Sequence, residues 1–253
     1  MDSTASRERH HTLAIGVGAA NVLDTYLSPM AYDGTDLRLV RQTERRACPL
    51  RMHAFPIYFQ TQLTLLADIL QNPARNIDSY AGGVRYTMAW LTPVKMAQTS
   101  PVDVMAGPML HGYLGGVYND HGGNNPAQAK ADITLDATAT VGLSLRLFRR
   151  PCRLVWQMAF PLVGAAFSPN FGQSYYEIFS KGEYDHNVVP VTLATMPSLR
   201  TQLMLDVPVS SRTDTKLRIG FVADMMQARI NNLRYHSYTQ NFMIGFSHSF
   251  LKL

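Results

Sequence analysis

The segment 131–148 carries the pattern that most limits what this chain can fold into. One parity is apolar throughout, and the other carries polar residues such as Thr134, Asp136 and Arg146. Alternation with a period of two is typical of a strand with two unlike faces. It persists for roughly fifteen residues, more than the nine to eleven that a strand needs to cross a bilayer. We therefore expect a membrane-type strand with lipid on one face and a polar lumen on the other.

Comparable segments recur along the whole chain. Strands are also expected at 11–22, 36–45, 52–66, 79–91, 102–117, 152–162, 198–207, 216–229 and 238–250. This predicts an all-β fold, a single transmembrane antiparallel β-barrel of about ten strands that takes in residues 1–253 as one domain. Twelve strands are the alternative if the irregular segment 164–196 adds a hairpin. A soluble barrel of the lipocalin type is the other alternative, and it would hide the apolar parity inside.

The connections between these strands predict how the barrel is oriented. Those after the first, third, fifth, seventh and ninth strands are long and polar, and the others are shorter, with basic residues beside them. Long outer loops and short periplasmic turns are the rule in outer-membrane barrels. The last expected strand also resembles the C-terminal insertion signal of such barrels, because aromatic residues recur on one of its parities. We expect an outer-membrane location, with both chain ends on the periplasmic side.

Composition excludes several classes of protein. Although 46% of the residues are hydrophobic, the sequence has no apolar run of about 18 residues, which argues against helical membrane spans. The net charge of +5 is mild, and no basic tract with interleaved aromatics suggests a nucleic-acid partner. Cys48 and Cys152 form neither a disulfide framework nor a metal motif. We expect no metal and no cofactor.

Three loop sequences resemble one known family. They are 23–29, which reads LDTYLSP, 124–127, which reads NNPA, and 167–179, which runs from FSP to YYEIF. These sequences resemble a family of Gram-negative outer-membrane proteins of about this length, known as a domain of unknown function. The resemblance would extend over nearly the whole chain. It implies a barrel in the outer membrane, and it implies no reaction.

The loops expected outside the cell hold the unusual polar and aromatic residues. If they converge over the barrel mouth, they favour a surface binding or complex-forming role. The partner would be outer-membrane lipid or lipopolysaccharide, or a protein of an outer-membrane complex. The plainer interpretation is that Asn, Asp, Gly and Pro serve as turn residues and that tyrosines line the membrane interface. The candidate binding residues are Tyr26, Asn119, Asn124, Asn125, Gln173, Tyr175 and Tyr176.

The alternative function is a surface hydrolase that cleaves lipid or peptide at the outer rim. His121 would act as the general base, with Asp24 or Glu177 as the acid that orients it. By architecture such a protein resembles the omptins, ten-stranded surface proteases that use Asp/Asp and Asp/His pairs. Barrel lipid hydrolases use Ser and His instead, and Ser174 with His121 or His186 would be the pair here.

Charged residues on the polar parities predict the content of the lumen. Facing lipid at the bilayer midplane, an arginine would cost roughly 2–4 kcal/mol. Facing inward, such residues must find partners. Because a barrel of about ten strands is narrow, we expect them to fill it largely, which argues against a general porin. The expected lumen charge network contains Arg38, Arg85, Asp136, Arg146, Arg200, Asp206, Arg218 and Asp224.

Overall fold

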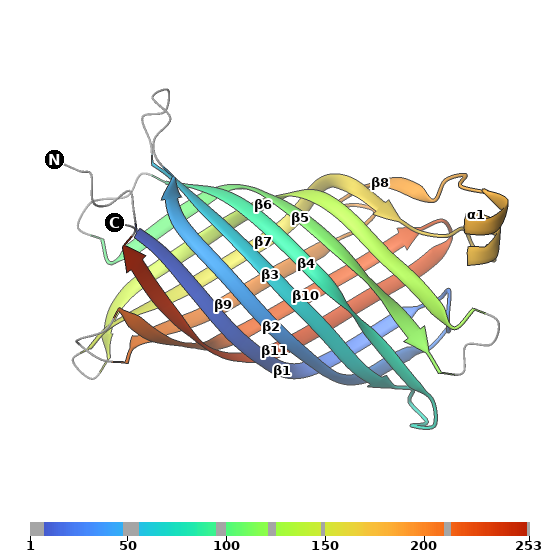
Figure 1. Ribbon diagram of the computed structural model, residues 1–253, viewed down its shortest axis with the longest axis horizontal. Helices are drawn as coiled ribbons and strands as arrows, with labels where there is room; N and C mark the ends of the chain where they lie inside the picture. The colour runs from blue at the N-terminus through green and yellow to red at the C-terminus, as the bar shows by residue number, and fades with distance from the viewer. Residues whose placement is uncertain are drawn as a thin grey trace.

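The computed structural model describes residues 8–47, 56–94, 100–120, 125–147, 150–209 and 214–251. Figure 1 shows a barrel of tilted strands with α1 beyond one end. We call this end the cap end, and we call the opposite end, where β1 begins and β11 finishes, the base. Within the described ranges, no helix is long and apolar enough to cross a membrane.

The secondary structure is almost entirely β. The elements are β1 (Glu8–Asp24), β2 (Ala31–Ala47), β3 (Ile57–Gln71), β4 (Asp78–Pro93), β5 (Val102–Asn119), β6 (Ala127–Leu147), β7 (Arg150–Phe167), α1 (Tyr175–Lys181), β8 (Val188–Thr192), β9 (Ser198–Pro208), β10 (Thr215–Ile230) and β11 (Leu233–Leu251).

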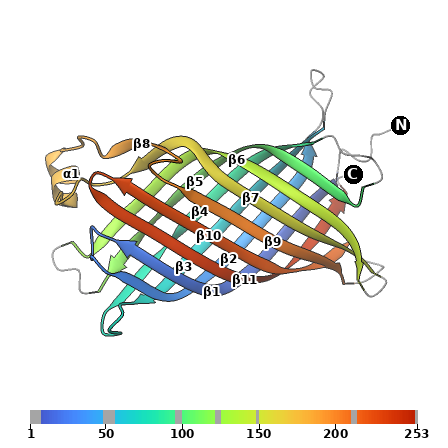
Figure 2. The same cartoon turned by 180° about the vertical axis from the view of Figure 1, so that it is seen from behind.

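Ten of the strands close into the barrel wall, and β8 is an additional strand. Every pairing is antiparallel, β1 pairs with β11 to complete the ring, and β7 pairs with both β6 and β9 (Figure 2). The expected ten-stranded all-β barrel is thus confirmed. The twelve-strand alternative is wrong, because β8 pairs only with the end of β7 at Val163–Phe167 and brings no second strand into the wall.

The two faces of each strand lie as the alternation predicts. On β6, Ile133 and Leu135 are exposed on the outside, whereas Thr134 and Asp136 are buried inside. The soluble alternative fails because the apolar parity is on the outer surface. β6 begins at Ala127, earlier than predicted, and Gln128 continues its inward face.

β7 contains an irregularity where its sequence cannot continue a regular ladder. Its register against β6 shifts between Leu135 and Asp136, which pair with Val163 and Pro161. Proline has no N–H to donate, so a bulge is the arrangement that tolerates it in a strand. Leu162 is the extra residue, and both Leu162 and Val163 are exposed on the outside.

The expected contrast between long and short connections is wrong in part. At the base, 48–56 is longer than the cap-end connection 25–30. At the cap end, β10 and β11 are joined by Asn231 and Asn232 alone, with φ values of 53° and 62°. Two successive residues with positive φ make the tight hairpin turn that asparagine tolerates. The bulk of the cap end comes instead from 168–197.

Candidate functional site

The helix α1 is short, and local side chains fix both of its ends. The Ser174 Oγ accepts a hydrogen bond from the Glu177 amide at 3.3 Å, and the Glu177 carboxylate accepts one from the Ser174 amide at 2.7 Å. This reciprocal pair is a capping box. At the other end Gly182 adopts the left-handed conformation, with φ 74° and ψ 27°. Glycine takes this conformation without the steric cost that a Cβ would impose.

Two tyrosines join α1 to other parts of the barrel rim. Tyr26, from the 25–30 connection, donates its hydroxyl to the Gln173 carbonyl at 2.9 Å, and its ring meets the Tyr175 ring edge-on at 5.9 Å. The Tyr175 hydroxyl accepts a hydrogen bond from the Ala129 amide on β6 at 2.6 Å. We call the connection 25–30 together with 168–187 the cap. It is one hydrogen-bonded unit that spans from β1 to β7.

The electrostatic setting keeps both phenols neutral near physiological pH. Burial raises the pKa of Tyr26, and the nearby Asp24 and Glu177 carboxylates raise it further. Burial likewise raises the pKa of Tyr175 to about 12, although the hydrogen bond from Ala129 opposes the shift. Both hydroxyls therefore keep the protons with which they can donate hydrogen bonds.

Gln173 is the centre of a polar network within the cap. Its Oε1 accepts hydrogen bonds from the Asn187 side chain at 2.7 Å and from the Asn170 amide at 3.0 Å. Its Nε2 donates to the Glu183 carbonyl at 2.8 Å. The Asn231 side chain adds a bond to the Ser168 carbonyl at 3.0 Å. The Oε1 and Nε2 of Gln173 are therefore both used within the loop, and these are the atoms with which Gln173 would bind a ligand.

The residues expected to form a catalytic site have other partners where they are described. The Asp24 Oδ2 lies 3.0 Å from the Lys130 Nζ, and its Oδ1 accepts from the Tyr26 amide at 3.1 Å. The Glu177 carboxylate caps α1, and those bonds from Ser174 lower its pKa, so it is ionised rather than a proton donor. His121 lies outside the described residues.

In the serine alternative, Ser174 and His186 likewise have other hydrogen-bond or ion-pair partners. The Ser174 Oγ donates to Glu177 at 3.0 Å in addition to its capping bond. His186 stands on an exposed turn, where its Nδ1 is 2.8 Å from the Asp185 carboxylate. Ser174 and His186 are thus each bonded to a carboxylate, and the pairing of Ser174 with His121 lies outside the described residues.

The other expected binding residues fall in different settings. Asn119 is buried at the end of β5, where it donates to the Tyr32 hydroxyl at 2.8 Å. Asn125 is half-buried just before β6, and Asn124 lies outside the described residues. Tyr176 is 66% exposed on α1.

The cap exposes more aromatic surface than the sequence suggested. Phe179 is 66% exposed, Phe171 71% and Tyr184 61%, in addition to Tyr176. The aromatic run 175–179 was a visible signal in the sequence. Phe171 and Tyr184 are isolated in it, and the Gln173 network holds their chain neighbours Asn170 and Glu183.

Beneath the cap, the lumen is filled by a hydrophobic core. Two clusters of inward residues occupy it, and Tyr235 packs against both. The strand β8 contributes Val191 to the second cluster. A polar lumen was expected here, and this half of the barrel instead combines hydrophobic clusters with buried polar residues such as Asn119, Gln128 and the Asp24–Lys130 pair. The clustered residues are Ala20, Val22, Tyr32, Leu70 and Val117, and Ala166, Val191, Met196, Ala228 and Ile230.

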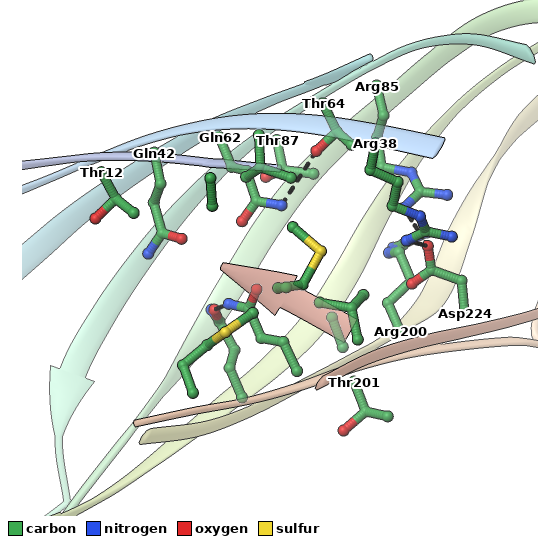
Figure 3. Close-up of a pocket in the computed structure, with 18 of the residues that line it drawn as sticks. Thr12, Arg38, Gln42, Gln62, Thr64, Arg85, Thr87, Arg200, Thr201 and Asp224 are labelled. Carbon is green, nitrogen blue, oxygen red and sulfur yellow. Dashed lines mark hydrogen bonds and ion pairs between the residues drawn. The ribbon is translucent and has the colours of Figure 1, made fainter. Parts of the chain in front are cut away.

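A layer of buried charges crosses the middle of the lumen. Arg38 and Arg85 both reach the Asp224 carboxylate at 2.6 Å, and Arg38 also pairs with Asp36 at 2.7 Å. Arg200 forms an ion pair with Asp136. It lies beside Asp224, its partner on the neighbouring strand (Figure 3). We call these six residues the charged layer.

Some residues of the expected lumen charge network lie outside the charged layer. Toward the base, Arg218 forms a two-pronged pair with Asp206 at 2.6 and 2.8 Å. Arg146 is exposed near the base end of β6 and lies outside the charged layer. A further pair went unnoticed in the sequence, His111 with Asp132 at 3.1 Å, because the glycine-rich strand β5 shows no clear alternation.

Below the charged layer the lumen holds open space. A cavity of about 70 Å³ lies against Arg38, Arg85 and Arg200, and one of about 700 Å³ continues toward the base. Gln60 and Gln157 stand between them, joined side chain to side chain by hydrogen bonds of 3.0 and 3.1 Å. The lumen is therefore packed at the cap end and hollow at the base.

Two solved structures align with nearly the whole chain. The outer membrane protease OmpT from Escherichia coli aligns over 99% of this chain and 99% of its own, with 7% sequence identity and a TM-score of 0.54. The transport unit of the autotransporter AIDA-I from Escherichia coli aligns over 95% of this chain and 90% of its own, with 9% identity and a TM-score of 0.46. At such identities the likeness to OmpT is one of fold.

No curated protein sequence matches the chain. One family model does, and its match runs over residues 2–253. By that match, the chain belongs to the family described as "Protein of unknown function (DUF3316)".

Proposed function

We propose that this chain is an outer-membrane barrel that displays its cap at the cell surface and binds a partner protein there. An outer-membrane location is supported by the fold likeness and by the apolar outer face. Outward residues such as Ile15, Val17, Leu203 and Phe221 are 44–59% exposed along the wall, as a lipid-facing band would be. In such barrels we expect the first strand to begin and the last strand to end on the periplasmic side. Because β1 begins and β11 ends at the base, the base would face the periplasm and the cap end would face outward.

The observation that carries the proposal is an ordered cap that nevertheless exposes aromatic side chains. Tyr26, Gln173 and Tyr175 hold the cap in one conformation, while Phe171 and Phe179 remain in contact with solvent. Several exposed aromatic side chains on one ordered segment are typical of an interaction site. Aromatic side chains are also enriched at protein–protein interfaces and among the residues that dominate their affinity.

A conducting role has less support. The hydrophobic core that contains Val22, Leu70 and Ile230 fills the lumen beneath the cap, and the charged layer crosses it further down. A general porin needs a continuous aqueous path through the barrel. We expect the purified barrel to give no stable open-channel current in a planar bilayer.

Photo-crosslinking in intact cells tests the binding proposal. A benzoylphenylalanine is placed at Phe179 in the full chain, and the cells are irradiated. We expect a discrete adduct that contains a second protein. Adding Phe171→Ser and Tyr176→Ser to the same chain should reduce that adduct strongly, because both substitutions remove aromatic surface from the cap.

The matched control carries the same photoreactive residue at Phe221, which is 45% exposed on the lipid-facing side of β10. This position should not give the adduct seen from Phe179. For each variant, a heated sample that migrates more slowly on electrophoresis than the unheated sample establishes that the unheated barrel is folded. A folded chain that crosslinks only to lipopolysaccharide, or to nothing, from Phe179 contradicts the proposal.

A further inference from the structure

A shallow apolar groove lies on the outer surface of the barrel, over β11, β1, β2 and β3. Its volume is about 450 Å³. Ala67, a small outward residue of β3, lies among larger side chains along it and leaves the space open. The larger residues are Ile15, Val17, Leu37, Leu39, Phe242 and Ile244. A groove with such walls suits a hydrocarbon chain and offers nothing to a polar ligand.

One edge of the groove is cationic. Arg41 is the next outward residue after Leu39 on β2, and it is exposed. Further toward the base, Arg45 is exposed and pairs across the strands with Arg9 on β1. The Arg45 guanidinium stands over the Phe59 ring at 4.9 Å from its centroid. Three arginines thus follow the groove along the same two strands.

This arrangement of arginines is unfavourable without an anion. Like charges directly opposite each other on adjacent strands repel, as Arg9 and Arg45 do. Within the described part of the chain, no carboxylate forms an ion pair with Arg9, Arg41 or Arg45. A phosphate is the natural counter-ion, because the planar guanidinium binds it through two parallel hydrogen bonds.

The direction of the charge identifies the kind of lipid. At the other edge of the groove, the next outward residues are Ala19, Thr35 and Gln240, which carry no charge. The phosphate therefore lies toward the base and the hydrocarbon chain toward the middle of the wall. Given the outer-membrane orientation proposed above, the base faces the periplasmic leaflet, whose phospholipids point their phosphates that way. Lipopolysaccharide in the other leaflet would present its phosphates toward the cap end.

We propose that this groove is a binding site for an anionic phospholipid, with an acyl chain between Leu39 and Ile244 and the phosphate against Arg41. Arg9 and Arg45 lie four residues further toward the base than the level of Arg41, about 13 Å along the strands, and their long side chains can reach back toward the rest of an anionic head group. The site selects by charge, so it prefers phosphatidylglycerol over a zwitterionic lipid.

Native mass spectrometry of the full chain tests this. The protein is purified in mild detergent and mixed with equal amounts of phosphatidylglycerol and phosphatidylcholine. We expect the barrel to retain phosphatidylglycerol preferentially, and Arg41→Gln to lower its retention about fivefold, the effect of one basic residue near an anionic surface. Ala67→Phe should lower retention of both lipids without any change in charge, because it fills the groove.

Arg229→Gln is the matched control. Arg229 is an exposed outward arginine of β10, near the cap end and far from the groove along the strands. This variant should retain phosphatidylglycerol within about twofold of the unmodified chain. Equal retention of the two lipids, or equal losses in Arg41→Gln and Arg229→Gln, would overturn the inference. A folded barrel without lipid preference contradicts this site alone, whereas a chain that stays folded and soluble without detergent contradicts the membrane location on which both proposals depend.

Discussion

The two halves of the lumen are built on different principles. At the cap end, Leu70 and Ile178 are fully buried and the interior packs like that of a soluble protein. At the base, glutamines and charged residues surround a cavity of about 700 Å³. The charged layer separates them. The difference teaches that alternation determines which residues face inward, whereas the size and polarity of those residues determine whether the interior is packed or contains a cavity. We therefore expect substitutions in the cap half and in the charged layer to lower the free energy of unfolding more than substitutions at the base.

The largest effect is expected from the charged layer. Asp224→Asn leaves Arg85 without its carboxylate and Arg38 with Asp36 alone, and an unpaired buried charge costs about 3–5 kcal/mol. The measurement is the free energy of unfolding in urea, followed by tryptophan fluorescence. Asp103→Asn is the control, because its pair with Arg153 is also 2.7 Å long but well exposed, and such pairs contribute about 0–1 kcal/mol. Equal costs for the two variants would mean that the charged layer is solvated.

The next effect compares the packed half directly with the hollow half. Leu70→Ala removes buried methyl groups from the cap-end core, and we expect a loss of about 2–5 kcal/mol in unfolding free energy. Met105→Ala, at the wall of the large cavity, should cost clearly less, because its side chain already borders open space. The comparison of the halves breaks down if the Met105 variant is the less stable of the two.

A smaller effect is expected in the cap. Tyr175→Phe removes the acceptor of the Ala129 amide bond, and because that bond is exposed to water we expect a local cost of about 0.5–1.5 kcal/mol. Hydrogen exchange of the Ala129 amide measures this opening. Tyr176→Phe is the control, because the Tyr176 ring is largely exposed, and it should leave that exchange rate unchanged.

The same tyrosine predicts a dependence on pH. The pKa of Tyr175 is raised from 10.0 to about 12, so its contribution to cap stability is complete below pH 10 and is lost as the pH rises toward 12. Protection of the Ala129 amide, corrected for the intrinsic exchange rate, should decline across that window. In Tyr175→Phe this part of the decline should be absent. A decline of the same size in the variant would assign it to another group.

The smallest effect is expected from Glu177→Gln, which keeps the shape of the capping box but removes its charge. Because the hydrogen bonds from Ser174 lower the pKa of Glu177, its contribution is present above the usual glutamate pKa of 4.5 and is lost as the pH falls through the lowered value. Proteolysis of the loop around α1 should be faster in the variant at neutral pH and equal in both chains in acid. A difference that persists in acid would contradict the charge argument.

Most of the barrel could be predicted from local pattern. The alternation at 131–148 identified outward-facing and lumen-facing residues, because side chains on a strand point to opposite faces in turn. The pattern failed on β5, because its glycines interrupt the alternation of apolar and polar side chains that shows which way a strand faces. The inward position of His111 was therefore missed. It also failed at 231–232, where two asparagines in a tight turn resemble a longer polar loop.

The cap could not be predicted to the same degree. The Tyr26 hydroxyl and the Gln173 carbonyl are 147 residues apart in sequence, and no periodicity reports a contact of that kind. Gln173 itself was an expected ligand-binding residue, whereas its amide is occupied by Asn170, Asn187 and Glu183. A polar side chain looks the same in the sequence whether it serves a ligand or its own loop.

The seam where β1 meets β11 has a consequence for how the barrel is made. It joins Glu8–Asp24 to Tyr235–Leu251, the first and last described strands, so it cannot form until the whole chain has been synthesised. The hairpins between neighbouring strands involve short loops and can form first, since local contacts carry the smaller entropic cost. Backbone approach at the seam is close, because a Cβ at Gly18 would come within 1.7 Å of the Gln240 carbonyl oxygen. Until the seam closes, β1 and β11 present open edges that hydrocarbon cannot satisfy, so the membrane location proposed above requires insertion and closure to proceed together.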